Sequence, residues 1–123
     1  MWKLTKSFRF EAAHSLANTN LGAAGEEIHG HSFRAEVVIR GTPDRETGTL
    51  VDLGVLESRL DSVRTSLDHK LLNRINDLGP PTLENLARFI WSRVQDIGNV
   101  VKVSVHRDRR AESCAYFGDN GQE

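Results

Sequence analysis

Residues 29–40, with the sequence HGHSFRAEVVIR, carry the pattern that decides the fold. Every second side chain is a histidine or an apolar residue, and most of the residues between them are polar, with Val38 as the apolar exception. A period of two residues is typical of a β-strand with one buried face. The stretch therefore predicts a strand whose inward face carries His29, His31, Phe33, Ala35, Val37 and Ile39.

The same period precedes this strand. Residues 3–14 alternate, and one face of the expected strand carries Phe8, Phe10, Ala12 and His14. Residues 15–28 are rich in Asn, Gly, Ala and Glu without a sustained period, which is typical of a loop. We therefore expect an antiparallel hairpin of two strands joined by this loop.

The rest of the chain predicts two helices and then two more strands. Asp52 is a plausible N-cap for a helix whose apolar stripe is Leu53, Leu56, Leu60, Val63 and Leu67. Thr82 can cap a second helix, with apolar residues continuing to Ile97 and Gly98 as its stop. Strands are expected over residues 101–105 and 113–117.

This order predicts an α+β fold in a single domain spanning residues 1–123. Four antiparallel strands would form a sheet with both helices on one face, in the order ββααββ. Such a sheet has two edge strands that must be blunted or joined to another chain, and we expect joining in a closed oligomer.

Composition narrows the class of protein. The 123 residues carry a formal net charge of −1, which implies no strong attraction to nucleic acid or to a membrane surface. No apolar run approaches the roughly 20 residues of a membrane span, and the N-terminus lacks the pattern of a signal peptide. The single cysteine, Cys114, excludes an internal disulfide, so we expect a cytoplasmic protein. Its place on the last expected strand favours a small buried side chain over a nucleophile.

Three of the five histidines can meet at one point. His29 and His31 share a strand face, and His14 ends the neighbouring strand on its inward face. Three neutral imidazoles with an open water position are typical of catalytic zinc, although His-Gly-His can also mark a strand start with two hydrogen-bonded histidines. His106, on a polar strand face, is interpreted as structural or solvated.

Asp68 and His69 follow the first expected helix. A carboxylate beside an imidazole can fix its tautomer and raise its basicity. The alternative is a histidine stabilised by the helix dipole at the C-terminal end.

Together these stretches resemble one family. FRFEAAHSL, HGHSF, TGTLVDLGVLES, LDHKLLN and PTLENLARFIW stand in the order expected for the 6-pyruvoyltetrahydropterin and 6-carboxytetrahydropterin synthases, and the short bacterial 6-carboxytetrahydropterin synthases are the closer match. The resemblance runs from about Ser7 to Tyr116. It implies a tunnelling fold in which three chains close a twelve-stranded barrel, two trimers stack into a hexamer, and active sites lie between subunits.

The resemblance also assigns roles to residues. It places His14, His29 and His31 on the family's zinc ligands and Asp68 and His69 on its catalytic relay. It places Thr82 in the segment that lines the pterin pocket. Asp52 and Leu53 fall in the segment that approaches the pterin from a neighbouring chain. Thr82 and Asp52 can act as helix caps at the same time.

The implied reaction is a lyase reaction on 7,8-dihydroneopterin triphosphate. Zinc binds the side-chain hydroxyls, a base removes a carbon-bound proton, and triphosphate is eliminated. In the 6-carboxytetrahydropterin branch, which feeds deazapurine and queuosine synthesis, the side chain is also cut and acetaldehyde leaves.

The sequence departs from the family pattern at two places. The family's cysteine base falls on Gly25 or Ala23, so Glu26 is the candidate base, matching a folate-linked subgroup that makes 6-hydroxymethyl-7,8-dihydropterin; the alternative is a solvated surface charge. The family's glutamate anchor for the pterin falls on Arg107 or, counting back from Tyr116, on Asp108. Asp108 is the preferred substrate-binding residue, with Glu112 as a less favoured candidate.

Three hypotheses follow for function. The first is a zinc-dependent lyase acting on dihydroneopterin triphosphate. The second is a lyase of the same mechanism with a different, non-pterin substrate, prompted by Arg107. The third is a non-catalytic binding paralogue, prompted by the missing cysteine.

Overall fold

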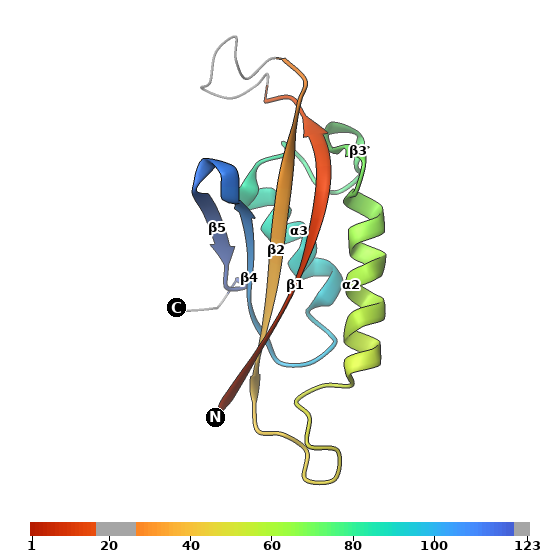
Figure 1. The fold of residues 1–123 in the computed structure, drawn as a ribbon, viewed down its shortest axis with the longest axis vertical. Helices are drawn as coiled ribbons and strands as arrows, with labels where there is room; N and C mark the ends of the chain where they lie inside the picture. Colours follow the sequence, from red (N-terminus) through yellow and green to blue (C-terminus); the bar gives the residue numbers. More distant parts are fainter. Residues whose placement is uncertain (17–26, 120–123) are drawn as a thin grey trace.

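A computed structural model describes residues 1–16 and 27–119 of the chain. The elements follow one another as two long strands, a helix, a short strand, a second helix and two further strands (Figure 1). Their bounds are β1 (Trp2–His14), β2 (His29–Gly41), α2 (Leu53–Leu67), β3 (Lys70–Leu71), α3 (Leu83–Val94), β4 (Val100–Arg107) and β5 (Glu112–Tyr116). Single 3₁₀ turns, η1 (Leu72–Arg74) and η2 (Asp108–Arg110), follow β3 and β4.

The strands form one sheet in the order β3-β1-β2-β4-β5. All neighbouring pairs are antiparallel except β1 and β3, which run parallel. The predicted α+β class and the four-strand core are confirmed. The sequence prediction missed β3, because its two residues are too few to show a period.

The β1–β2 ladder is the longest element of the sheet. It pairs residue for residue from Trp2 opposite Gly41 to His14 opposite His29. The predicted alternation is correct along both strands, since Phe10, Phe33, Ala35 and Val37 are all buried. Val38, the one apolar residue on the polar face, is also buried, and it lies at a register shift between β2 and β4.

Both helices cover the same face of the sheet (Figure 1). α2 packs against β1, and α3 packs against β4 and β5. Their apolar stripes close the core over the inward strand residues; the buried helical side chains are Leu56, Leu60, Val63, Leu67, Leu86, Ala87, Phe89, Ile90 and Val94.

No helix in the described part of the chain is long and apolar enough to cross a membrane.

The helix starts agree with the sequence prediction, and one helix end does not. Asp52 accepts hydrogen bonds from the backbone N–H groups of Gly54 and Val55, and Thr82 accepts one from Asn85. α3 ends at Val94, not beside Gly98, because the chain turns there and packs Ile97 against the core from outside the helix. An apolar residue at helical spacing is therefore not proof of helix.

Two hydrogen bonds to the backbone of Glu11 fasten the C-terminal end of α2 to β1. The backbone N–H of Glu11 donates to Asp68 Oδ1 over 2.8 Å, and the backbone N–H of His69 donates to the carbonyl oxygen of Glu11 over 2.6 Å. His69 has a φ of 59°, in the left-handed region that commonly ends helices. This turn brings Lys70 and Leu71 alongside β1 as the parallel strand β3.

Burial of the α2 stripe should dominate the stability of this layer. Leu60→Ala removes a side chain that is 2% exposed, and we expect it to lower the free energy of unfolding by about 2–5 kcal/mol. The matched change Glu57→Ala, at an exposed position of the same helix, should stay within about 0.5 kcal/mol of the parent chain. Chemical denaturation of both variants checks this, and equal effects would contradict the packing.

Candidate metal centre and the cavities beside it

Three histidines converge where β1 ends and β2 begins. His14 lies directly opposite His29 in the β1–β2 ladder, and His31 lies opposite Ala12. One nitrogen from each ring lies within 4.8 Å of the others, so the three side chains form a cluster that could hold a metal ion. The sequence prediction that they meet is confirmed by the coordinates.

Two of the rings have their tautomers fixed by the backbone. His14 Nδ1 lies 2.9 Å from the carbonyl oxygen of Pro81, and His29 Nδ1 lies 2.9 Å from that of Glu27. A carbonyl only accepts, so each Nδ1 carries the proton and each Nε2 presents a lone pair. These two Nε2 atoms lie 3.0 Å apart, close enough for both to bind one metal ion.

The cluster fits a zinc ion. Zinc–nitrogen bonds of about 2.0–2.1 Å in a tetrahedron place neighbouring nitrogens about 3.3 Å apart. Ligating histidines commonly donate their other N–H to a carbonyl, as His14 and His29 do here. With His31 as the third ligand, His14, His29 and His31 would leave one tetrahedral position open.

The surroundings of His14 and His31 disfavour protonation of their rings. Burial lowers the pKa of His14. Burial, followed by the positive charge of Arg107, lowers the pKa of His31 to about 4. Neutral imidazole is the metal-binding form, so burial favours the form of both rings that can bind a metal.

Arg107 is the unforeseen neighbour of this cluster. Its Nη1 donates to His31 Nε2 over 3.2 Å, and its Nη2 pairs with Glu112. The side chain is only 17% exposed, and its Nε is buried with no hydrogen-bond partner among the described residues. Arg107 lines both cavities that flank the histidines.

The first cavity, of about 390 Å³, lies beside His14. Thr82, Glu112 and Cys114 line it together with Arg107. Cys114 is half-buried, and burial raises the pKa of its thiol, so it is not activated as a nucleophile. Thr82, expected from the resemblance in the substrate pocket, does lie in this cavity as well as capping α3.

The second cavity, of about 610 Å³, lies across the ends of β1, β2 and β3. His31 and His69 both line it. Behind His69, the Asp68 carboxylate is held by the Glu11 N–H, which lowers its pKa, and it lies 3.6 Å from His69 Nε2. His69 therefore lines the same cavity as His31, with its imidazole exposed to solvent, and the catalytic role of Asp68 and His69 stays a prediction.

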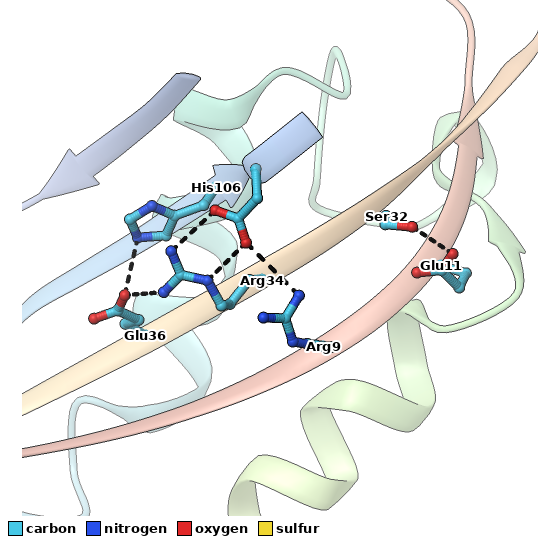
Figure 2. Close-up of polar contacts among 7 residues, drawn as sticks. Arg9, Glu11, Ser32, Arg34, Glu36 and His106 are labelled. Carbon is cyan, nitrogen blue, oxygen red and sulfur yellow. Dashed lines mark hydrogen bonds and ion pairs between the residues drawn. The ribbon is translucent and has the colours of Figure 1, made fainter. Parts of the chain in front are cut away.

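The Asp108 carboxylate lies on the face of the sheet that carries no helices, beside Arg34. Its carboxylate accepts two hydrogen bonds from Arg34, over 2.9 and 3.0 Å, which lower its pKa, and Arg9 lies 3.6 Å away. Figure 2 shows this polar network on β1, β2 and β4, where Arg34 also pairs with Glu36. His106 joins the network through Glu36, in keeping with the structural role interpreted from the sequence.

The remaining predicted residues lie elsewhere. Asp52 and the exposed Leu53 stand at the N-terminal end of α2, at the opposite end of the molecule from the histidines (Figure 1). A helix of 15 residues is about 22 Å long, so within one chain they do not reach the cluster. Glu26 and the positions Ala23 and Gly25 lie outside the described residues.

Sequence reasoning missed the cationic rim of the second cavity. Lys70, Arg107, Arg109 and Arg110 all line it. Of these, the sequence analysis singled out only Arg107, at the position of the family's glutamate anchor and as the reason to expect a different substrate. The signal was present in the run Arg107-Asp108-Arg109-Arg110, which places three guanidinium groups in four residues. Glu112 was considered but not preferred, because counting along a strand does not register the 3₁₀ turn η2.

Comparisons with known proteins agree with this fold. Residues 3–119 match the family model described as 6-pyruvoyl tetrahydropterin synthase. A 6-carboxy-5,6,7,8-tetrahydropterin synthase from Synechocystis is 38% identical over 103 residues, covering 80% of this chain and 78% of the relative. A dihydroneopterin monophosphate aldolase from Pyrococcus furiosus is 38% identical over 86 residues, covering 70% and 68%. The structure of a Caenorhabditis elegans 6-pyruvoyl tetrahydropterin synthase superposes with a TM-score of 0.82 at 22% identity, covering 96% of each chain.

Acid should weaken the metal-free protein in a defined pH window. His14 and His31 have pKa values below their usual 6.5 in the folded chain, so the unfolded chain takes up protons first as the pH falls. Stability present above pH 6.5 should therefore be lost progressively toward about pH 4, where folded His31 is also protonated. Asp68 and Asp108, whose pKa values are lowered in the folded chain, reduce the stability only as the pH approaches their usual pKa of 3.8.

Urea denaturation of metal-free protein at about pH 7 and about pH 5 measures this effect. We expect a lower midpoint at the lower pH and a smaller drop in His31→Gln, which has no imidazole to protonate. An unchanged midpoint in the parent chain would show that the histidines are not held neutral by the fold.

Proposed function

This chain belongs to the 6-pyruvoyl tetrahydropterin synthase family, and we propose that it is a zinc-dependent lyase acting on 7,8-dihydroneopterin triphosphate. Relatives named 6-carboxytetrahydropterin synthase and dihydroneopterin monophosphate aldolase support a lyase of pterin biosynthesis. The observation that carries the proposal is the pair of Nε2 lone pairs facing each other at 3.0 Å beside His31, with two cavities adjoining.

Zinc is the proposed cofactor, held by His14, His29 and His31. When bound there, it supplies a Lewis acid that polarises substrate oxygens and acidifies the carbon-bound protons beside them. The chain's own contribution is to hold His14 and His31 neutral by burial. It also orients His14 and His29 through the carbonyls of Pro81 and Glu27.

The cavity beside His14 suits the pterin ring. Thr82 offers a hydroxyl there, and Glu112 offers a carboxylate for the guanidine-like edge of the ring. Asp108 was the expected anchor, but Arg34 holds it on the face of the sheet that carries no helices. We therefore propose Glu112 as the anchor, with Arg107 fixing its carboxylate.

Proton transfer is assigned to the residues around the second cavity. His69 is exposed there, with Asp68 fixed behind it by Glu11 and Arg64. Glu26, three residues before His29, is the proposed base in place of the family's cysteine. A glutamate becomes a stronger base when it is partly desolvated, and a bound substrate would provide that.

The proposed lyase reaction has two candidate products. The Synechocystis relative favours 6-carboxytetrahydropterin and hence 7-deazapurine and queuosine-type synthesis. The Pyrococcus relative, together with a glutamate base, favours side-chain cleavage to 6-hydroxymethyl-7,8-dihydropterin for folate synthesis. The further alternatives are a lyase of the family that acts on a non-pterin substrate and a non-catalytic binding paralogue. Both require that the protein turns over no pterin.

Assembly is proposed to complete the site. From Trp2 to Glu11, β1 pairs only with β2, and β5 pairs only with β4, within the described residues. Joining these edges between copies would close a barrel of three chains, and two trimers would form a homohexamer. A neighbouring chain would also bring Asp52 and Leu53 to a cluster that they do not reach within one chain. We place this assembly in the cytoplasm.

Zinc-loaded protein should convert 7,8-dihydroneopterin triphosphate, with the product identified by mass. We expect about one zinc per chain from the three-ligand rule. Zinc removal or His31→Ala should abolish turnover, while His106→Ala, which alters a histidine outside the cluster, should keep its zinc and its activity. Full activity of metal-free protein would refute the zinc mechanism.

The base can be tested with two adjacent glutamates. Glu26→Gln should lower kcat by about 10²–10⁴, the usual range for loss of a general base, without loss of zinc. Glu27→Gln is the matched control, because Glu27 contributes its backbone carbonyl to His29 and should stay near parent activity. Equal rates in the two variants would leave His69 as the base.

A further inference from the structure

We propose that Arg34 is a positioning residue for the cavity beside His14. By holding Asp108 on the face of the sheet that carries no helices, it leaves Glu112 as the carboxylate that serves this cavity. This inference rests on the proposed function, in which Glu112 anchors the pterin ring. It adds a residue of β2 that acts on the anchor through the turn between β4 and β5.

Arg107 and Glu112 form the last rung of the β4–β5 ladder. They lie directly opposite each other, their side chains form an ion pair, and both line the cavity beside His14. Residues 108–111 connect them through the 3₁₀ turn η2 and Ala111. The directions in which these two side chains leave the sheet therefore depend on the conformation of this turn.

The turn has little of its own to fix that conformation. Ala111 has a φ of 52°, in the left-handed region that side chains other than those of Asn and Asp rarely adopt. The backbone N–H of Ala111 donates to the carbonyl oxygen of Asp108 over 3.1 Å. Within the described residues, no side chain caps the start of η2. A contact from outside the turn can therefore decide its conformation.

Arg34 supplies such a contact. Its Nε and Nη2 donate to the two carboxylate oxygens of Asp108 over 2.9 and 3.0 Å, a bidentate pair that fixes direction as well as distance. The Arg34 side chain is only 24% exposed and also pairs with Glu36 on its own strand (Figure 2). Arg9 adds a longer contact to Asp108 at 3.6 Å. The first residue of the turn is thus tied to β2 by a guanidinium that has little freedom to move.

Fixing Asp108 also fixes the face of its neighbour Arg107. Successive side chains along a strand point to opposite faces, so Asp108 on the face without helices places Arg107 on the covered face. There Arg107 donates to His31 and pairs with Glu112. Without Arg34, the Asp108 carboxylate is free to compete with Glu112 for Arg107 and for the cavity.

Steady-state kinetics of the zinc-loaded protein with 7,8-dihydroneopterin triphosphate test this role. Arg34→Gln and Asp108→Asn should each raise KM about tenfold and leave kcat within about twofold, because a displaced anchor weakens binding of the ground state and the transition state alike. The double variant should raise KM no further than either single change, because both changes remove the same pair.

Glu36→Gln is the matched control. It removes the other partner of Arg34 and leaves the Arg34–Asp108 pair intact, so KM should stay at the parent value. An unchanged or lower KM in Arg34→Gln would overturn the role, and so would an equal rise in Glu36→Gln. Effects of Arg34→Gln and Asp108→Asn that multiply in the double variant would also overturn it, as would a fall in kcat at constant KM.

The turn can also be observed without substrate, which separates this role from the proposed function. Amide hydrogen exchange at Ala111, followed by NMR, should be about tenfold faster in Arg34→Gln and Asp108→Asn and unchanged in Glu36→Gln. If the parent chain turns over no pterin, the proposed function fails, and the exchange rates still decide whether Arg34 holds the turn. If the parent chain is active and exchange is the same in all variants, only the positioning role is wrong.

Discussion

The register of the β1–β2 ladder is the constraint on which the rest of this molecule depends. It sets His14 opposite His29 and puts the phenylalanines of both strands on the same buried face, where Phe10 and Phe33 stack with ring centroids 5.0 Å apart. A slip of one residue would turn the inward side chains of one strand to the solvent face. The same apolar packing that stabilises the sheet therefore also brings the three histidines together.

A second constraint is the attachment of α2 to β1 through Glu11. Its N–H and its carbonyl bind Asp68 and His69 respectively, so the residue fixes both members of the proposed relay through its backbone alone. Its carboxylate points to the opposite face of the strand, toward Ser32 (Figure 2). The helix end, the left-handed turn at His69 and the parallel strand β3 follow from this one attachment, and together they form a wall of the second cavity.

Much of this could be predicted from the sequence because it depends on local periods. Alternation gave β1 and β2 with their faces, three-and-four spacing gave α2, and the three histidines followed from sharing an inward face. The place of Asp108 could not be predicted, because a 3₁₀ turn and a left-handed Ala111 change the direction of the chain between β4 and β5. Whether Asp108 or Glu112 faces the pocket depends on that turn, and neither spacing nor composition reports it. The role of Glu26 stays a prediction, since it lies outside the described residues.

The distances along the chain between the parts of the site have a consequence for folding. His14 and His29 are separated by 15 residues, whereas His31 and Arg107 are separated by 76. Closing the longer loop costs about 1.4 kcal/mol more chain entropy, because the cost grows with the logarithm of loop length. The hairpin bearing the histidines can thus form early, and the arginine and glutamate at the cavities come into place only when β4 pairs with β2. A nascent chain would then bring its proposed metal ligands together before the cavities beside them are complete.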